Sequence, residues 1–149
     1  IEHAILACVW GPAPVWIADG TIFVRGRAEH APRRLLDFLK NEARKMLGRR
    51  ADEFAARLGV RPARITVRDT ASRWGSCSSA RSLSFSWRLI LAPPFVLDYV
   101  VAHEIAHLRE MNHGAAFWRH VESLIGDLKK PQGWLNRHGG ALQRFAPRK

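Results

Sequence analysis

Residues 95–108 read FVLDYVVAHEIAHL, and this stretch decides how the rest of the chain is interpreted. Apolar residues occupy nearly every side of the helix that it predicts, which is typical of a helix buried inside a protein. Asp98 interrupts the apolar pattern near the start of the stretch, and two histidines, His103 and His107, with the acid Glu104 interrupt it near the end. Burying three such side chains without partners costs on the order of several kcal/mol, so we expect a ligand to satisfy them. A metal ion supplies that compensation.

Helix geometry predicts which of these side chains bind the metal and which one acts as a base. Residues four apart lie on one face of a helix, so His103 and His107 can bind a single Zn²⁺ at about 2.0–2.1 Å. Glu104 lies at the flank of that face and is placed to take a proton from a water molecule at the metal. The spacing therefore predicts a zinc site with Glu104 as general base. The alternative is two core histidines bonded to backbone carbonyls and a solvent-facing Glu104.

A catalytic zinc site needs a third protein ligand and an open position. His113 is the expected third ligand, because Asn and Gly on either side of it let the chain turn back after the helix. The spacing H-E-x-x-H-x5-H equals that of metzincins, but Glu110 stands where that pattern has glycine, which argues against a true metzincin. The rival third ligands are Glu122, His120 and His138.

Further motifs flank the predicted helix on both sides. They are RWGSCS at residues 73–78, SWRL at 86–89, YVVAHEIAHL at 99–108, NHG at 112–114 and FW at 117–118. Together they resemble the YgjP-like metallopeptidase family, whose relatives include the SprT-like and WLM zinc proteases. Ser86 departs from the family pattern, which usually has Asn before Trp-Arg.

The resemblance implies an α+β, zincin-like metallopeptidase domain, with a small antiparallel sheet packed on the helix that carries HExxH. It also implies that His103, His107 and His113 are the metal ligands. Arg73 and Arg88 lie in the shared motifs, and their guanidinium groups can bind a substrate carboxylate or phosphate, or stabilise an oxyanion. For Arg73 the alternative is a stacked pair with Trp74 that closes the core.

Composition and length bound the remaining possibilities. With 149 residues, 47% of them hydrophobic and 25% charged, the chain is expected to form one domain over residues 1–149. No apolar run approaches the roughly 20 residues that span a bilayer, so no membrane is expected as a partner. Cys8 and Cys77 are far apart, and no secretory leader is visible, which predicts reduced thiols and a cytoplasmic protein. Cys77 is expected to be a small buried thiol.

The formal net charge of +11 raises the chance of an anionic partner such as nucleic acid. A predicted helix from Ala31 to Gly48 concentrates this charge on one side and is the expected phosphate-binding surface. The alternative is a solvated basic surface without a partner. The basic residues on this helix are Arg33, Arg34, Lys40, Arg44 and Lys45.

Periodicity and turn residues predict the other elements. We expect a hairpin around Asp19-Gly20, a helix that stops at Gly48 and a second helix over residues 51–58. Strands are expected over 64–69 and 83–91, with a loop over 73–79. Helices are expected over 95–111 and 115–125, followed by a short helical turn in the tail.

Three functions fit these observations. The leading one is hydrolysis of a peptide bond in a protein or peptide substrate, in a more specific version a protein attached to DNA. A second is hydrolysis of a nucleotide phosphoanhydride, as in a nucleoside triphosphate pyrophosphatase, with Arg73 and Arg88 holding phosphate oxygens. A third is a non-catalytic, metal-stabilised module that binds nucleic acid. Glu104 weakens the third, because a structural metal site has no need of a base.

Overall fold

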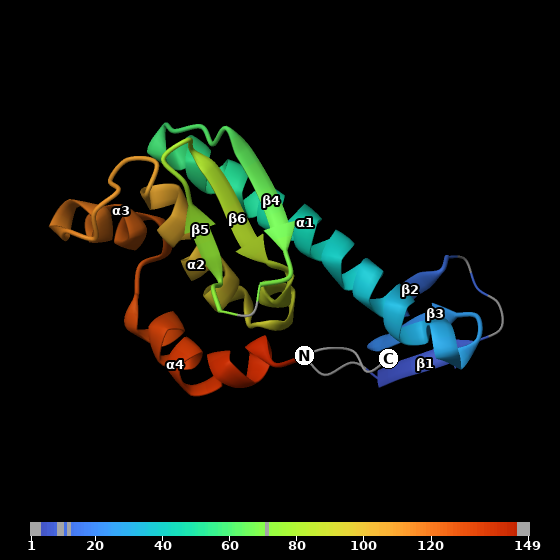
Figure 1. Cartoon of the computed structure of the whole chain (residues 1–149). Helices are drawn as coiled ribbons and strands as arrows, with labels where there is room; N and C mark the ends of the chain where they lie inside the picture. Colours follow the sequence, from blue (N-terminus) through green and yellow to red (C-terminus); the bar gives the residue numbers. More distant parts are fainter. Residues whose placement is uncertain (1–3, 9–10, 12, 71, 146–149) are drawn as a thin grey trace. The chain divides into compact units, whose positions relative to one another are not determined.

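The computed structural model describes residues 4–8, 11, 13–70 and 72–145. The chain divides into two compact units (Figure 1). The first comprises Ile1–Asn41 and Ala146–Lys149, and the second comprises Glu42–Phe145. One domain over residues 1–149 therefore stays a prediction.

The first unit contains a three-stranded sheet in the order β1-β3-β2, formed by β1 (Ala4–Cys8), β2 (Val15–Ala18) and β3 (Thr21–Arg25). β2 and β3 form the expected antiparallel hairpin. Asp19 and Gly20 both have positive φ, 48° and 72°, as a two-residue hairpin turn requires. β1 pairs with β3 in parallel and was not predicted. The side chain of Cys8 lies outside the described part of the chain.

Helix α1 (Ala31–Leu58) begins in the first unit and ends in the second. The predicted stop at Gly48 is wrong, because the helix continues through it. Glycine inside a helix costs about 1 kcal/mol relative to alanine. Leu47 and Ala51 on either side of Gly48 are fully buried, at 0% exposure, and their packing outweighs that cost.

The second unit is built around a sheet in the order β4-β6-β5, formed by β4 (Arg64–Arg68), β5 (Gly75–Cys77) and β6 (Ser82–Ser86). β4 runs parallel to β6, whereas β5 runs antiparallel to it. The predicted α+β class is confirmed, but the sheet is mixed rather than antiparallel. β5 lies within the predicted loop over residues 73–79, because backbone pairing with β6 orders this short polar segment.

β6 is followed by a 3-10 helix, η2 (Trp87–Leu91), so the predicted strand over 83–91 is only half right. The Ser86 side chain accepts a hydrogen bond from the backbone N–H of Arg88 and caps the first turn of η2. The change from strand to helical turn thus has a local cause. It also gives Ser86, the departure from the family pattern, a structural role.

Three helices complete the second unit: α2 (Pro94–Ala106), α3 (Ala115–Ile125) and α4 (Lys129–Gln143). α2 lies at the centre and packs against β5, β6, η2, α3 and α4. It ends before the predicted Met111, α3 has the predicted bounds, and α4 is longer than the predicted turn. Within the described ranges, no helix combines the length and apolar character needed to span a bilayer.

Candidate metal centre

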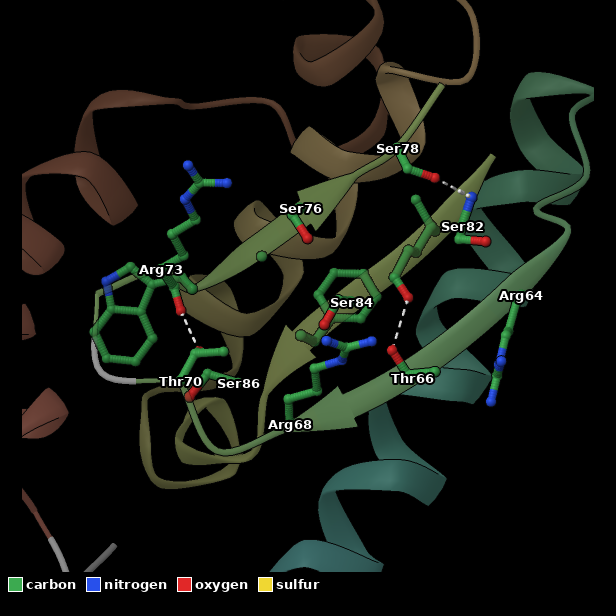
Figure 2. Close-up of a pocket in the computed structure, with 14 residues that line it drawn as sticks. Arg64, Thr66, Arg68, Thr70, Arg73, Ser76, Ser78, Ser82, Ser84 and Ser86 are labelled. Carbon is green, nitrogen blue, oxygen red and sulfur yellow. Dashed lines mark hydrogen bonds between the residues drawn. The ribbon is translucent and has the colours of Figure 1, made fainter. Parts of the chain in front are cut away.

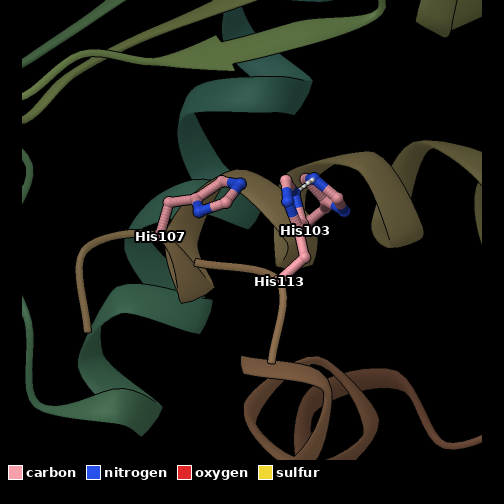
Figure 3. A group of neighbouring side chains, drawn as sticks. All are labelled: His103, His107 and His113. Atoms are coloured by element: carbon pink, nitrogen blue, oxygen red, sulfur yellow. Dashed lines mark hydrogen bonds between the residues drawn. The ribbon is translucent and has the colours of Figure 1, made fainter. Parts of the chain in front are cut away.

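The centre is built at the carboxyl end of α2. Most of this helix is buried, including Val101, Ala102, Ile105 and Ala106 at 0% exposure, as the apolar pattern predicted. His107 is the C-cap residue, where the backbone leaves the helix. The chain then turns through residues 107–114 and enters α3, which places His113 beside the end of α2 (Figure 3).

The three predicted histidines come together. One ring nitrogen from each of His103, His107 and His113 lies within 4.8 Å of the others. The Nε2 atoms of His113 and His103 are 3.2 Å apart (Figure 3). Nitrogens that bind one tetrahedral metal ion at about 2.0–2.1 Å are roughly 3.3 Å apart, close to the distance between His103 and His113, so the cluster fits a metal site. Glu122, His120 and His138 do not belong to this cluster.

Neighbouring groups orient the imidazoles. Nδ1 of His107 lies 3.1 Å from the backbone carbonyl oxygen of Glu110. A carbonyl oxygen only accepts hydrogen bonds, so Nδ1 carries the proton and Nε2 keeps the lone pair that a metal requires. Phe117 of α3 is fully buried, and its ring centroid lies 4.5 Å from that of His107 and 4.9 Å from those of His103 and His113. The cluster is therefore packed against a rigid aromatic ring.

The electrostatics favour the neutral form of His103 and His107. Burial, followed by the charges of His107 and His113, lowers the pKa of His103 from its ordinary 6.5 to about 4. Burial also lowers the pKa of His107. Neutral imidazole is the form that binds a metal ion, so these two side chains can bind one at neutral pH without losing a proton.

Glu104 lies next to His103 on α2 but outside the histidine cluster. Its side chain is buried, with the residue only 6% exposed. Burial raises the pKa of Glu104 from 4.5 to about 7, and the positive charge of Arg73 acts in the opposite direction. A carboxyl group with a pKa near neutrality can both accept and return a proton. These are the properties of a general acid–base group.

Gly75 of β5 allows this carboxylate to sit against the sheet. A Cβ atom at position 75 would lie 2.8 Å from Cγ of Glu104 and 3.2 Å from Cγ1 of Val100, both closer than normal packing allows. Any side chain here would displace Glu104. The sequence shows a glycine at this position of the RWGSC motif. Why a glycine is needed there becomes clear only from the packing of β5 against α2.

A hollow of about 210 Å³ opens beside Glu104 and His103. Exposed Arg73 lies at this hollow, and Tyr99 of α2 and Leu135 of α4 also line it; substrate binding by Arg73 stays a prediction. Leu135 carried no sequence signal, because α4 reaches the site only through tertiary packing. The hollow provides room for a substrate next to the histidine cluster.

Arg88 is placed differently from Arg73. It is 7% exposed, forms an ion pair with Asp69 and donates a hydrogen bond of 2.9 Å to the backbone carbonyl of Phe145. Its guanidinium group also lies over the ring of Trp87 at 4.9 Å. Arg88 does not line the hollow. The geometry gives it a role in packing and gives no support to substrate binding.

Cys77 of β5 is half-buried and forms no disulfide. Burial, and then the charge of Glu104, raises the pKa of its thiol. A raised pKa disfavours the thiolate, which is the nucleophilic and metal-binding form. The thiol therefore fits the packing role that was expected.

Comparisons with known proteins agree with this geometry. Residues 19–138 match the YgjP-like, metallopeptidase domain family. The crystal structure of the metallopeptidase zymogen of Pyrococcus abyssi abylysin is similar in fold, with a TM-score of 0.55 at 19% sequence identity, covering 67% of this chain and 98% of that chain. No curated protein matches the chain. With a zincin-like α+β fold and a family match over most of its length, the chain belongs to the YgjP-like metallopeptidase domain family.

Proposed function

We propose that the chain is a zinc-dependent peptidase in which His103, His107 and His113 bind Zn²⁺ and Glu104 is the general base. The observation that carries the proposal is a division between ligands and base. Three imidazoles converge with Nε2 atoms as close as 3.2 Å, and a buried carboxylate lies beside them without joining the cluster. A structural zinc site usually has four protein ligands, whereas this cluster of described residues offers three.

The donor set and the family support zinc and a peptide substrate. Imidazole nitrogens suit Zn²⁺ among the common metals, although they also bind other transition metals. When bound, Zn²⁺ supplies a Lewis acid that polarises the scissile carbonyl and lowers the pKa of water. Membership of a metallopeptidase family favours a peptide bond over a phosphoanhydride as the bond that is cleaved.

The remaining chemistry belongs to Glu104. Its carboxylate accepts the proton of the attacking water and delivers a proton to the leaving amine nitrogen. In the metal-free protein, burial raises the pKa of Glu104 to about 7, and this effect of burial favours the protonated form that returns the proton. Packing against Gly75 restricts the movement of the Glu104 side chain for both transfers.

An extended peptide can reach Glu104 along β5. This strand is at the edge of the β4-β6-β5 sheet and packs against α2. Peptides commonly add to such an edge as a further strand, held by backbone hydrogen bonds. A substrate bound in this way passes Gly75, with Arg73 beside it to bind a carbonyl or carboxylate oxygen.

Turnover measurements with and without metal test the proposal. The zinc-loaded protein should cleave an unstructured protein, and a chelator should abolish the cleavage until zinc is restored. Nucleoside triphosphates serve as the competing substrate class under the same conditions. Hydrolysis of the triphosphates without peptide cleavage would replace the peptidase with a phosphohydrolase. Zinc binding without either activity would favour a non-catalytic module.

Nucleic acid binding by the basic side of α1 stays a prediction. Several of its basic residues are engaged within the protein: Arg34 donates a hydrogen bond to the backbone carbonyl of Arg25, Lys45 pairs with Glu42 at 2.9 Å, and Arg44 also has an interaction partner. Nothing in the contacts of this helix selects nucleic acid over water. The proposed peptidase activity does not depend on it.

A further inference from the structure

The sheet of the second unit has a polar outer face that the proposed catalytic chemistry does not use (Figure 2). Side chains alternate along each strand. On β6, Leu83 and Phe85 are buried at 1% exposure, while Ser82 and Ser84 lie on the other face. Register places Thr66 of β4 and Ser76 of β5 on either side of Ser84. A row of hydroxyl groups therefore crosses all three strands.

This face forms a groove of about 280 Å³. Three arginines and seven serines or threonines line it, and none of its lining residues is acidic. Arg64 and Arg68 lie two residues before and after Thr66 on β4, and both are exposed. Within the described residues neither forms an ion pair. The groove thus offers positive charge and hydroxyl donors to a ligand that brings negative charge.

The groove meets the catalytic hollow. Arg73, Trp74 and Gly75 line both. Gly75 is also the residue against which Glu104 packs. A chain that passes Glu104 along the edge strand β5 therefore comes beside Arg73, which belongs to the groove as well.

We propose that this groove, defined by Arg64, Arg68 and Arg73, binds an acidic segment of the protein substrate next to the cleaved bond. The inference rests on the proposed peptidase function and assigns its substrate class. Carboxylates of Asp or Glu in the substrate pair with the guanidinium groups, and the hydroxyl groups of Ser76 and Ser84 donate further hydrogen bonds, whereas that of Thr66 already donates to the backbone carbonyl of Leu83. Substrates with acidic residues near the cleaved bond are then preferred over neutral ones.

An acidic peptide fits the groove better than a single strand of nucleic acid. Proteins that bind single strands without sequence preference stack successive bases on several aromatic side chains. Here Trp74 is the one aromatic ring among the lining residues that is not buried, since Phe85 belongs to the core. The floor of the groove consists of small hydroxyl side chains, which suit carboxylate oxygens and provide no stacking surface.

Binding tests the groove independently of catalysis. The Glu104→Gln protein, loaded with zinc, is titrated with two fluorescent peptides of equal length, one carrying a block of Asp and Glu and one carrying Ser and Gln instead. We expect the acidic peptide to bind about three- to tenfold more tightly, the range for two exposed ion pairs. Adding Arg64→Ser and Arg68→Ser should remove most of the preference and leave only the part that depends on Arg73. Adding Arg64→Glu and Arg68→Glu should shift it toward a basic peptide.

A matched control removes the same charge elsewhere. Arg49 on α1 and Arg119 on α3 are exposed and do not line the groove. Their joint replacement by Ser should leave the preference unchanged. If this control lost the preference for the acidic peptide as completely as the Arg64→Ser and Arg68→Ser variant, the proposal would be wrong. It would also be wrong if the Glu104→Gln protein without further changes showed no preference. Tighter binding of a single-stranded oligonucleotide that depends on Arg64 and Arg68, while the acidic peptide does not bind, would overturn the proposal as well.

Cleavage of the same peptides by the zinc-loaded wild-type protein separates the two proposals. We expect kcat/KM for the acidic peptide to exceed that for the neutral peptide by about the same factor as in binding. The joint Arg64→Ser and Arg68→Ser replacement should reduce cleavage of the acidic peptide and retain cleavage of the neutral peptide. Equal cleavage of both peptides would contradict the proposed role of the groove and would still support the proposed peptidase activity. Arginine-dependent binding of the acidic peptide without cleavage of either peptide would support an acidic-ligand groove and overturn the peptidase.

Discussion

Replacing Glu104 with Gln should make the metal-free protein more stable and should make the zinc-loaded protein inactive. Burial raises the pKa of Glu104 from 4.5 to about 7, so the folded state holds this proton more tightly than the unfolded state. Stability therefore falls as pH rises from about 4.5 to about 7. At roughly 1.4 kcal/mol for each pH unit, the ionised carboxylate costs about 3 kcal/mol above pH 7. Gln has a similar shape and no proton to lose, so the variant avoids this cost.

The stability gain should appear only at higher pH. Above pH 7, with a chelator present, Glu104→Gln should raise Tm by about 6–12 °C, at ~2–4 °C for each kcal/mol in a chain of this size. Near pH 4 the two proteins should unfold at similar temperatures. Thermal unfolding across this pH range measures the difference. Glu110→Gln is the matched control, because that residue is exposed in the turn after α2.

Activity should change in the opposite direction. Loss of a general base typically costs about 10²–10⁴-fold in rate, so peptide cleavage should fall by at least that much. Zinc content, measured by elemental analysis, should stay near one ion per chain. If the variant lost zinc as completely as a histidine variant, Glu104 would be a ligand or its essential support. Retention of both zinc and full activity would show that another residue is the base.

Three further substitutions test the site and its surroundings. His113→Ala should lose zinc and activity together, and undiminished zinc affinity would remove it from the ligand set. Gly75→Ala should keep zinc but lower kcat roughly 10- to 100-fold, because its methyl group displaces Glu104; unchanged kinetics would contradict the close packing seen here. Arg88→Ala should lower the free energy of unfolding by about 1–3 kcal/mol through loss of its ion pair with partly exposed Asp69. Urea unfolding measures this change. KM should stay unchanged if Arg88 does not bind substrate.

Much of the candidate centre could be predicted because its parts are close in sequence. His103, Glu104 and His107 lie within two turns of one helix, so helix geometry alone relates their side chains. His113 follows after a short turn, which limits how far it can lie from the helix end. The apolar composition of α2 also predicted its burial, and burial raises the pKa of Glu104 and lowers that of His103.

Local patterns were less reliable where packing competes with propensity. Gly48 carries a stop signal, yet buried neighbours carry α1 through it. Residues 75–77 have the composition of a loop, yet backbone pairing with β6 makes them a strand. In both cases tertiary packing or strand pairing outweighs the local preference of the sequence.

Sequence by itself determined the identity and spacing of the proposed metal ligands and the base. Only the tertiary structure decided which arginine faces the site, since Arg73 lies at the hollow while Arg88 is buried against Asp69. It also decided that Gly75 meets Glu104, and that hydroxyls from three strands form one groove. The physical reason is that helix geometry relates neighbours along the chain, whereas strand register and helix packing relate residues that the sequence separates.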